Sequence, residues 1–106
     1  MTIRSDIIRG HTETIILAHL INGNSYGYEI NKSIKEKTDN KYELSDATLY
    51  SAFRRLEEAG YITSFWGDGN SGARRRYYSI TNEGIDHYKK CIEEWEITKN
   101  LIDKLV

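Results

Sequence analysis

A capped amphipathic helix followed directly by a β-hairpin is the feature of this chain that most restricts its fold. Ser45 is a favourable N-cap residue and Gly60 is a typical helix stop, so the sequence predicts a helix between them. Two runs rich in aromatic and β-branched residues follow at 61–66 and 74–80. They flank the glycine-rich stretch GDGNSGA, which predicts a hairpin with a flexible tip.

The predicted helix has one apolar face and one polar face. At 3.6 residues per turn, the residues expected to be buried are Leu49, Ala52, Phe53 and Leu56. The opposite face carries Ala47, Tyr50, Ser51 and Arg54, flanked by Thr48 and Arg55. This face is small, hydroxyl-bearing and basic, as a surface that binds nucleic acid would be. An ordinary solvated face has a similar composition, so this helix alone leaves both interpretations open.

Two further helices are predicted before this one. The apolar block Ile7–Ile21 predicts a first helix that Gly23 ends, although the interior Gly10 disfavours its first turns. Ser25 is expected to cap a second helix that runs to about Lys37, and the polar turn TDNK follows. No proline, linker or repeat interrupts the chain.

The last predicted helix runs from about Thr81 to the C-terminus, roughly 37 Å at 1.5 Å per residue. Its apolar stripe has a heptad-like spacing and includes Tyr88, Ile92, Trp95, Ile102 and Val106. A core of three short helices cannot cover a stripe of this length, so the sequence predicts a symmetric homodimer. We therefore expect a winged domain at residues 1–80 and a dimerisation helix at residues 81–106.

The positive charge of the chain is concentrated locally. The formal net charge is −1, yet Arg74, Arg75 and Arg76 are consecutive, and residues 81–106 carry four basic and six acidic side chains. DNA affinity depends on cations at the contact surface and not on the net charge of the whole protein. Charged residues also protect an exposed edge strand from pairing, so the arginine run alone does not decide between the two roles.

The sequence offers little support for an enzyme or a membrane protein. His11, His19 and His87 have no metal-ligand spacing with one another or with Cys91. No glycine-rich phosphate loop and no set of nucleophile and base is indicated. The apolar run at 15–18 is far too short to span a bilayer, and nothing resembles a signal peptide. With a single cysteine, we expect a cytoplasmic protein without catalytic activity, metal or cofactor.

Three helices followed by a two-stranded wing is the order of a winged helix–turn–helix. The motifs YGYEI at 26–30, ATLYSAFRRLEEAGYI at 47–62, RRRYYSIT at 74–81 and EEW at 93–95 resemble the PadR family of bacterial transcriptional regulators. The resemblance covers residues 7–106 and is to short members with a single C-terminal dimerisation helix. It implies a mainly α fold with a small β-hairpin, and a repressor that binds a palindromic DNA operator as a homodimer.

The resemblance assigns DNA contact to the third helix and the hairpin. The implied contacts are Thr48, Ser51 and Arg54 in the major groove, Tyr50 and Arg55 near phosphates, and Arg74 and Arg75 on the wing. Arg76 is expected to turn inward and pack on Trp66, and Lys32 and Lys35 are weaker candidates for phosphate contact. Asp46 stands where many members have proline, so the recognition helix is expected to begin slightly differently.

The resemblance also implies a ligand site at the dimer interface. In multidrug-sensing members a tryptophan of each subunit stacks on flat aromatic compounds, and Trp95 matches that position. The other implied residues are Ile7, Gly10 and Thr14 on the first helix, and Cys91 and Lys99 on the last. Lys99 replaces an acidic residue, which favours neutral or anionic compounds over cations. A tryptophan that only packs in the dimer core, with no pore, stays open as an alternative.

A second class of function also stays open from the sequence alone. A winged-helix module used for protein–protein assembly would place the same arginines against an acidic partner. Sequence-specific DNA binding would separate the two, because an assembly module has no preference for one DNA sequence.

Overall fold

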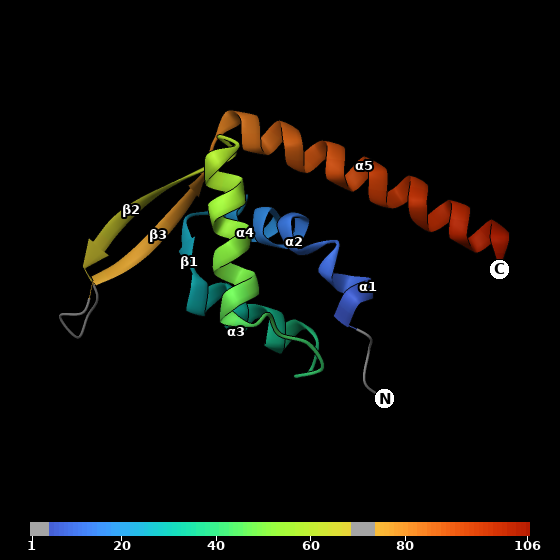
Figure 1. The fold of residues 1–106 in the computed structure, drawn as a ribbon, viewed down its shortest axis with the longest axis horizontal. Coiled ribbons are helices and arrows are strands. Elements are labelled where there is room, and N and C mark those ends of the chain that lie inside the picture. The colour runs from blue at the N-terminus through green and yellow to red at the C-terminus, as the bar shows by residue number, and fades with distance from the viewer. Residues whose placement is uncertain (1–4, 69–73) are drawn as a thin grey trace.

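The chain folds into a cluster of short helices beside a three-stranded sheet, with one long helix extending away from both (Figure 1). The computed structural model describes residues 5–68 and 74–106. Its elements are α1 (Ser5–Arg9), α2 (Thr12–Leu20), β1 (Ser25–Tyr26), α3 (Gly27–Lys37), α4 (Asp46–Glu58), β2 (Ile62–Asp68), β3 (Arg74–Ile80) and α5 (Asn82–Leu105). The mainly α winged fold with a long last helix is confirmed.

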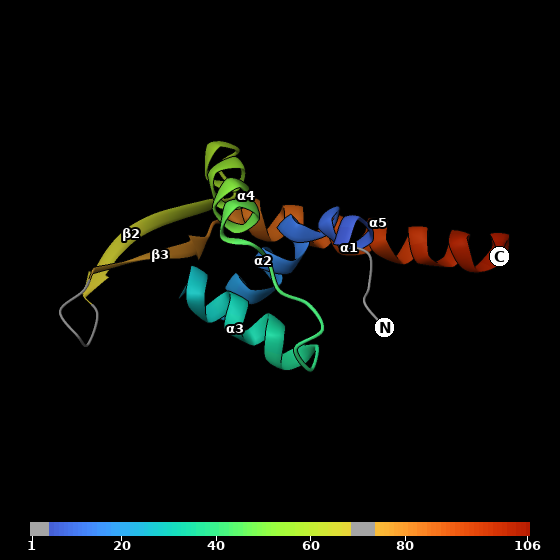
Figure 2. The ribbon, with the colours of Figure 1, turned by 60° about the horizontal axis from the view of Figure 1, so that its bottom comes forward.

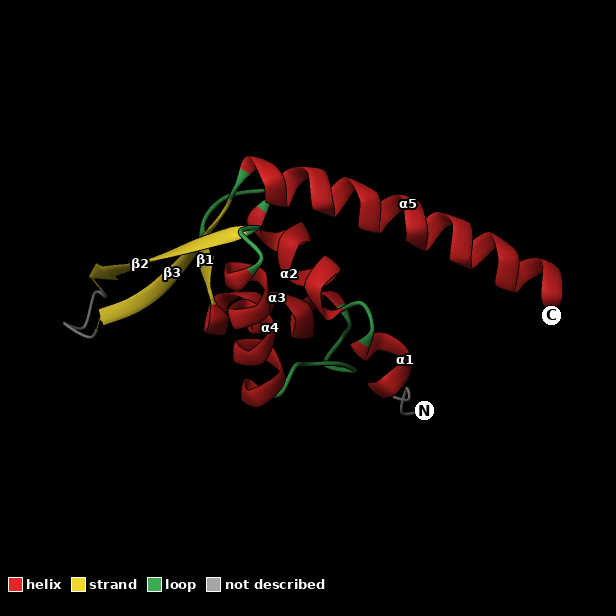
Figure 3. Ribbon diagram, turned by 45° about the horizontal axis from the view of Figure 1, so that its top comes forward, coloured by secondary structure: helices red, strands yellow, loops and turns green. Residues whose placement is uncertain are grey.

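The sheet contains one strand that the sequence did not predict. Its antiparallel order is β1-β3-β2, and the three strands lie together on one side of the helices (Figure 3). The hairpin of β2 and β3 is confirmed, but the predicted tip at 67–73 begins too early, because β2 continues through Asp68. Residues 69–73 lie outside the described residues. The prediction that Ser25 caps the second helix is wrong, because Ser25 pairs with Tyr78 in the sheet. Tyr26 is the N-cap residue and makes no side-chain capping bond.

The predicted first helix is divided in two. α1 ends at Arg9 and α2 begins at Thr12, so a single helix over 7–21 is wrong. Gly10 lies in the break, where its low helix propensity permits a change of direction. The Thr12 hydroxyl donates to the Arg9 carbonyl at 2.8 Å, which satisfies an acceptor that a continuous helix would use.

The core joins the helices to the hairpin of β2 and β3, which we call the wing. Its fully buried large residues are Phe53, Ile16, Leu17, Leu20, Ile30, Leu49, Leu56 and Ile62. The four residues of α4 expected to be buried are all buried. Phe53 also stacks on Tyr78 of β3, with ring centroids 3.8 Å apart. The wing and α4 therefore share one packed interior.

Both ends of α4 follow the predicted signals. The Ser45 hydroxyl accepts the Thr48 N–H at 3.2 Å, and Gly60 after the helix has φ +82°. The loop before α4 is also tied to α3. The Asn31 amide donates to the Leu44 carbonyl at 2.8 Å and accepts the Leu44 N–H at 2.9 Å. These bonds fix the angle between the two helices of the helix–turn–helix.

A compact junction joins α4, the wing and α5. Thr81 caps α5, because its hydroxyl accepts the Gly84 N–H at 3.0 Å and donates to the Gly60 carbonyl at 2.7 Å. The Thr81 N–H donates to the Tyr61 carbonyl at 3.0 Å. Beyond this junction α5 packs on α2 and then extends past the helical cluster, opposite to the wing (Figures 1 and 2). No helix in the described ranges has the length and apolar character of a membrane span.

Candidate functional site

The outward face of α4 presents Tyr50 and Arg54 to solvent. Both residues are exposed, and Tyr50 is 52% exposed although it contacts the buried Phe53 ring edge-to-face. Within the described parts of the chain, the Arg54 guanidinium makes no hydrogen bond or ion pair. An exposed guanidinium without an internal partner keeps all its donors for a base edge or a phosphate.

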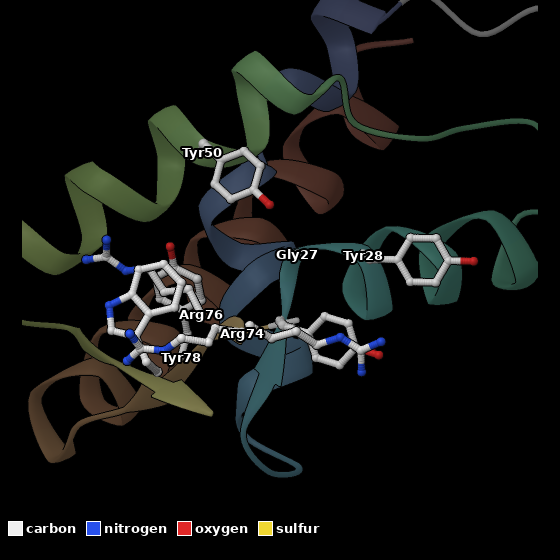
Figure 4. Close-up of a pocket in the computed structure, with 9 residues that line it drawn as sticks. Gly27, Tyr28, Tyr50, Arg74, Arg76 and Tyr78 are labelled. Carbon is white, nitrogen blue, oxygen red and sulfur yellow. The ribbon is translucent and has the colours of Figure 1, made fainter. Parts of the chain in front are cut away.

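A cavity of about 480 Å³ lies between α4, the wing and the start of α3 (Figure 4). Its lining residues are Tyr26, Gly27, Tyr28, Tyr50, Trp66, Arg74, Arg75, Arg76 and Tyr78. The structure thus brings the predicted residues Tyr50, Arg74 and Arg75 together. Sequence reasoning missed Tyr26 and Tyr28 as members of this group, although they belong to the quoted motif YGYEI.

The wing arginines are held by aromatic rings. The Arg75 guanidinium lies 4.7 Å from the centroid of Tyr26, and the Arg74 guanidinium lies 5.2 Å from that of Trp66. A guanidinium that stacks on a ring keeps its charge and its in-plane donors. The cavity therefore presents oriented cations, an arrangement that suits phosphate oxygens.

Arg76 connects the wing to α4. Its Nη2 donates to Glu57 Oε1 at 3.3 Å and to the Ser64 hydroxyl at 2.9 Å, and Ser64 donates to Glu57 Oε2 at 2.6 Å. The guanidinium also lies 5.8 Å from the centroid of the Trp66 ring, so the expected proximity to Trp66 is confirmed. The side chain stays exposed, however, so the expectation that it turns inward is wrong. Among the described residues, Arg76 has a carboxylate partner on α4, whereas Arg74 and Arg75 have none.

The floor of the cavity is uncharged and closely packed. Burial raises the pKa of the Tyr78 hydroxyl above 10.0, so this phenol stays neutral at pH 7. At Gly27, a Cβ atom would lie 2.9 Å from the Tyr50 hydroxyl oxygen. Glycine therefore makes room for the Tyr50 ring, which points from α4 toward the start of α3 (Figure 4).

The remaining DNA-contact candidates of α4 lie on another flank of the helix. A cavity of about 270 Å³ there is lined by Arg9, Thr12, Ala47, Thr48, Ser51 and Arg55. The Thr48 hydroxyl accepts a bond from Ser45 at 2.9 Å. Arg55 Nη1 donates to the Ser51 hydroxyl at 2.8 Å, and Arg55 Nε lies 3.4 Å from a carboxylate oxygen of Glu13. These side chains already have intramolecular partners, unlike Arg54.

The two lysines of α3 are the most peripheral candidates. Lys32 is exposed, and the Lys35 ammonium lies 3.8 Å from the Glu43 carboxylate. Neither lysine lines the cavity shared by α4 and the wing.

A third cavity, of about 280 Å³, lies between α2 and α5. It is lined by Gly10, His11, Glu13, Thr14, His87, Cys91, Glu94, Trp95 and Thr98. Of the residues implied for a ligand site, Gly10, Thr14, Cys91 and Trp95 are brought together here. Ile7 and Lys99 do not line this cavity in the single chain. The Lys99 ammonium instead pairs with Glu96 at 3.1 Å, 6.0 Å from the Trp95 ring.

Sequence reasoning missed the acidic and imidazole groups of this cavity. The His11 ring meets Trp95 edge-to-face at 4.8 Å. His87 stacks on Tyr61 at 4.0 Å, and its Nε2 lies 3.6 Å from the Cys91 sulfur. The only sequence signal was that His87, Cys91, Glu94 and Thr98 are spaced by three or four residues, which puts them on one face of a helix. No group of His, Cys, Asp and Glu side chains in the described ranges is suited to hold a metal ion.

Comparisons with known proteins identify the family of this chain. The family model of PadR-like transcriptional regulators matches residues 16–90. A transcriptional regulator from Clostridium thermocellum is 56% identical, with 99% of each chain covered and a TM-score of 0.90. A PadR family regulator from Clostridium difficile R20291 is 32% identical, covering 90% of this chain and 97% of that one, with a TM-score of 0.77. An uncharacterized protein of Lysinibacillus sphaericus is 42% identical over 95% of this chain and 93% of its own length.

The family match, the fold and the arginines of the wing and α4 thus all indicate a DNA-binding regulator. The chain belongs to the PadR-like family of transcriptional regulators.

Proposed function

We propose that this DNA-binding regulator is a cytoplasmic repressor that binds a palindromic operator as a homodimer. The observation that carries the proposal is the cavity in which Tyr50 of α4 meets the arginines of the wing. One surface thereby combines a helix suited to the major groove with cations suited to the flanking phosphates. The family is a class of regulators and not of enzymes, which agrees with a site built from arginine and tyrosine.

The dimer is proposed from the uncovered face of α5. Its exposed large apolar residues are Ile92, Trp95, Ile97, Leu101, Ile102, Leu105 and Val106. So many exposed apolar side chains on one helix mark an interaction site, and a symmetric partner covers two such faces at once. We propose that residues 81–106 pack against the same helix and the α1–α2 region of the partner, while residues 1–80 bind DNA.

An electrophoretic shift assay on the protein's own promoter region tests the proposed function. We expect a discrete complex that random duplex of the same length displaces poorly. Equal competition by operator and random DNA would contradict a sequence-specific regulator and would favour an assembly module.

Arg54→Ala and Arg75→Ala should weaken DNA binding in different ways. If Arg54 makes a bidentate base contact, its loss costs roughly 1–3 kcal/mol on the operator and much less on random DNA. Arg75 on the wing is expected to contact phosphate, so its loss should weaken both duplexes alike and flatten the salt dependence. Fluorescence anisotropy at several salt concentrations measures both effects. Unchanged binding by both variants would contradict this placement of the DNA surface.

We also propose that a flat aromatic compound binds beside Trp95 at the dimer interface and releases the operator. Trp95 is 40% exposed in the single chain and offers its indole to the cavity. Lys99 led us to expect a neutral or anionic guest. Because Glu13 and Glu94 line the cavity and Lys99 does not, we propose a cationic guest instead. Release requires that the guest bind the DNA-free arrangement of the two wings better than the DNA-bound one.

Tryptophan fluorescence should report this binding. The chain has two tryptophans, so Trp66→Phe leaves Trp95 as the only source of tryptophan emission. We expect planar aromatic cations to quench this variant more strongly than planar anions, because two carboxylates line the cavity. Trp95→Ala should no longer bind these compounds when binding is measured by calorimetry. Quenching by no compound, or equal affinity in Trp95→Ala, would show that Trp95 only packs.

A further inference from the structure

Glu13 lies between α4, the proposed recognition helix, and the cavity of α2 and α5 that we propose as the ligand site. It belongs to the first turn of α2 and lines the cavity that α2 forms with α5. Its Oε1 lies 3.4 Å from Nε of Arg55, a residue of α4. The side chains are 38% and 54% exposed, so water screens this ion pair only in part. One carboxylate is therefore shared by the two sites.

Arg55 extends this contact along α4 to Ser51, a residue expected to read the major groove. Its Nη1 donates to the Ser51 hydroxyl at 2.8 Å. A guanidinium held at Nε by a carboxylate and at Nη1 by a hydroxyl has a defined plane, and its remaining N–H groups point in set directions. Such an arginine loses less rotamer freedom on binding DNA than an unrestrained one does.

We propose that Glu13 is a positioning residue for operator recognition, and that a cation in the ligand cavity competes with Arg55 for it. This inference rests on the proposed DNA-binding function. Glu13 orients Arg55 and Ser51 for the operator through the contacts described above. Its negative charge also opposes the binding of any duplex, because DNA affinity is dominated by phosphate neutralisation. The first effect widens the difference between operator and random DNA, whereas the second lowers the affinity for both duplexes alike.

The chemistry of the cavity identifies the competing guest as an aromatic cation. Glu13 and Glu94 supply negative charge, and Trp95 supplies an aromatic face. A guest that pairs with Glu13 weakens the hold of this carboxylate on Arg55, and by reciprocity an operator that needs Arg55 in place weakens guest binding. The guest therefore lowers the preference for the operator even where α5 does not move.

The test compares the wild type, Glu13→Gln, Arg55→Ala and the double variant on operator and on random duplex by fluorescence anisotropy. Glu13→Gln should bind random duplex more tightly. It should lose roughly two- to fivefold of the operator preference per protomer, the range of an exposed ion pair, or about four- to twenty-five-fold for a dimer. In the Arg55→Ala background, Glu13→Gln should leave the preference unchanged.

Glu58→Gln is the matched control. It removes the same charge from an exposed position of α4, where the side chain has no ion pair or hydrogen bond within the described ranges. It should strengthen binding to both duplexes alike. Full operator preference in Glu13→Gln would overturn the positioning role. A wild type with no operator preference would instead overturn the proposed function.

The competition is tested with benzyltrimethylammonium chloride, using benzyl alcohol and an equal concentration of sodium chloride as controls. The cation should lower the operator preference of the wild type toward that of Glu13→Gln, and it should leave Glu13→Gln unchanged. An unaffected wild type, or an equal fall in both proteins, would overturn the link through Glu13.

Discussion

Gly84→Ala is expected to lower the free energy of unfolding by about 3 kcal/mol, because the position has no room for a side chain. Gly84 is buried in the first turn of α5. A Cβ atom there would overlap the Tyr61 carbonyl oxygen and would lie 2.8 Å from Cγ1 of Ile80. The obstructing oxygen belongs to backbone that also accepts the Thr81 N–H, so it cannot move aside without breaking that bond.

Gly10→Ala is the control for this prediction. In the described parts of the single chain, no atom lies within 4 Å of a Cβ built at Gly10, so alanine should change stability by less than about 1 kcal/mol. Urea unfolding at one fixed protein concentration compares the two variants with the wild type. Equal stability of Gly84→Ala and the wild type would contradict the close packing at this junction.

The Gly84 junction also has a functional consequence. Thr81 bonds to Gly60 after α4, to Tyr61 before the wing and to Gly84 in α5. The angle between α5 and α4 is therefore set by a few short backbone contacts. In the proposed dimer, this angle sets the separation of the two recognition helices, and hence the spacing of the operator half-sites. A folded Gly84→Ala protein should bind the operator with altered spacing preference.

The recognition helix was predictable because its signals are local. Ser45, Gly60 and the apolar face of α4 all lie within one stretch of sequence, and the structure confirms each of them. β1 was not predictable in this way. Ser25 pairs with Tyr78, far along the chain, and a two-residue strand has no periodicity of its own. Ser25 therefore passed for a helix cap, since a serine before a helix usually is one.

The site shows the same contrast between local and distant contacts. Alternation along β3 puts Arg74 and Arg76 on the same face, and the guanidinium groups of both lie near the Trp66 ring. The pairing of Arg55 with Glu13 joins α4 to α2 and has no sequence signature. Lys99 is one helical turn from Trp95, yet it pairs with Glu96 and does not line the cavity. Contacts between side chains of different helices and strands could therefore be identified only from the structure.

Ile102→Asp should convert the proposed homodimer into a folded monomer. Ile102 is 53% exposed in the single chain and lies in the apolar stripe of α5 beyond the helical cluster. A symmetric interface contains each residue twice, so the change removes two buried isoleucines, each contributing about 1.5–3 kcal/mol. Two buried carboxylates add a desolvation penalty. The dimer dissociation constant should therefore rise more than about 100-fold.

Sedimentation equilibrium at micromolar concentration measures this change. We expect the wild type at about twice 12.3 kDa and Ile102→Asp near 12.3 kDa. Asn100→Asp adds the same charge to an exposed position outside the stripe and should remain dimeric. Circular dichroism should show that both variants keep their helices, because Ile102 lies outside the buried core of the chain. A wild type that sediments as a stable monomer, or an Ile102→Asp protein that stays dimeric, would contradict the interface.

Because a palindromic operator is bound by two recognition helices at once, the monomer should lose far more operator affinity than affinity for random DNA.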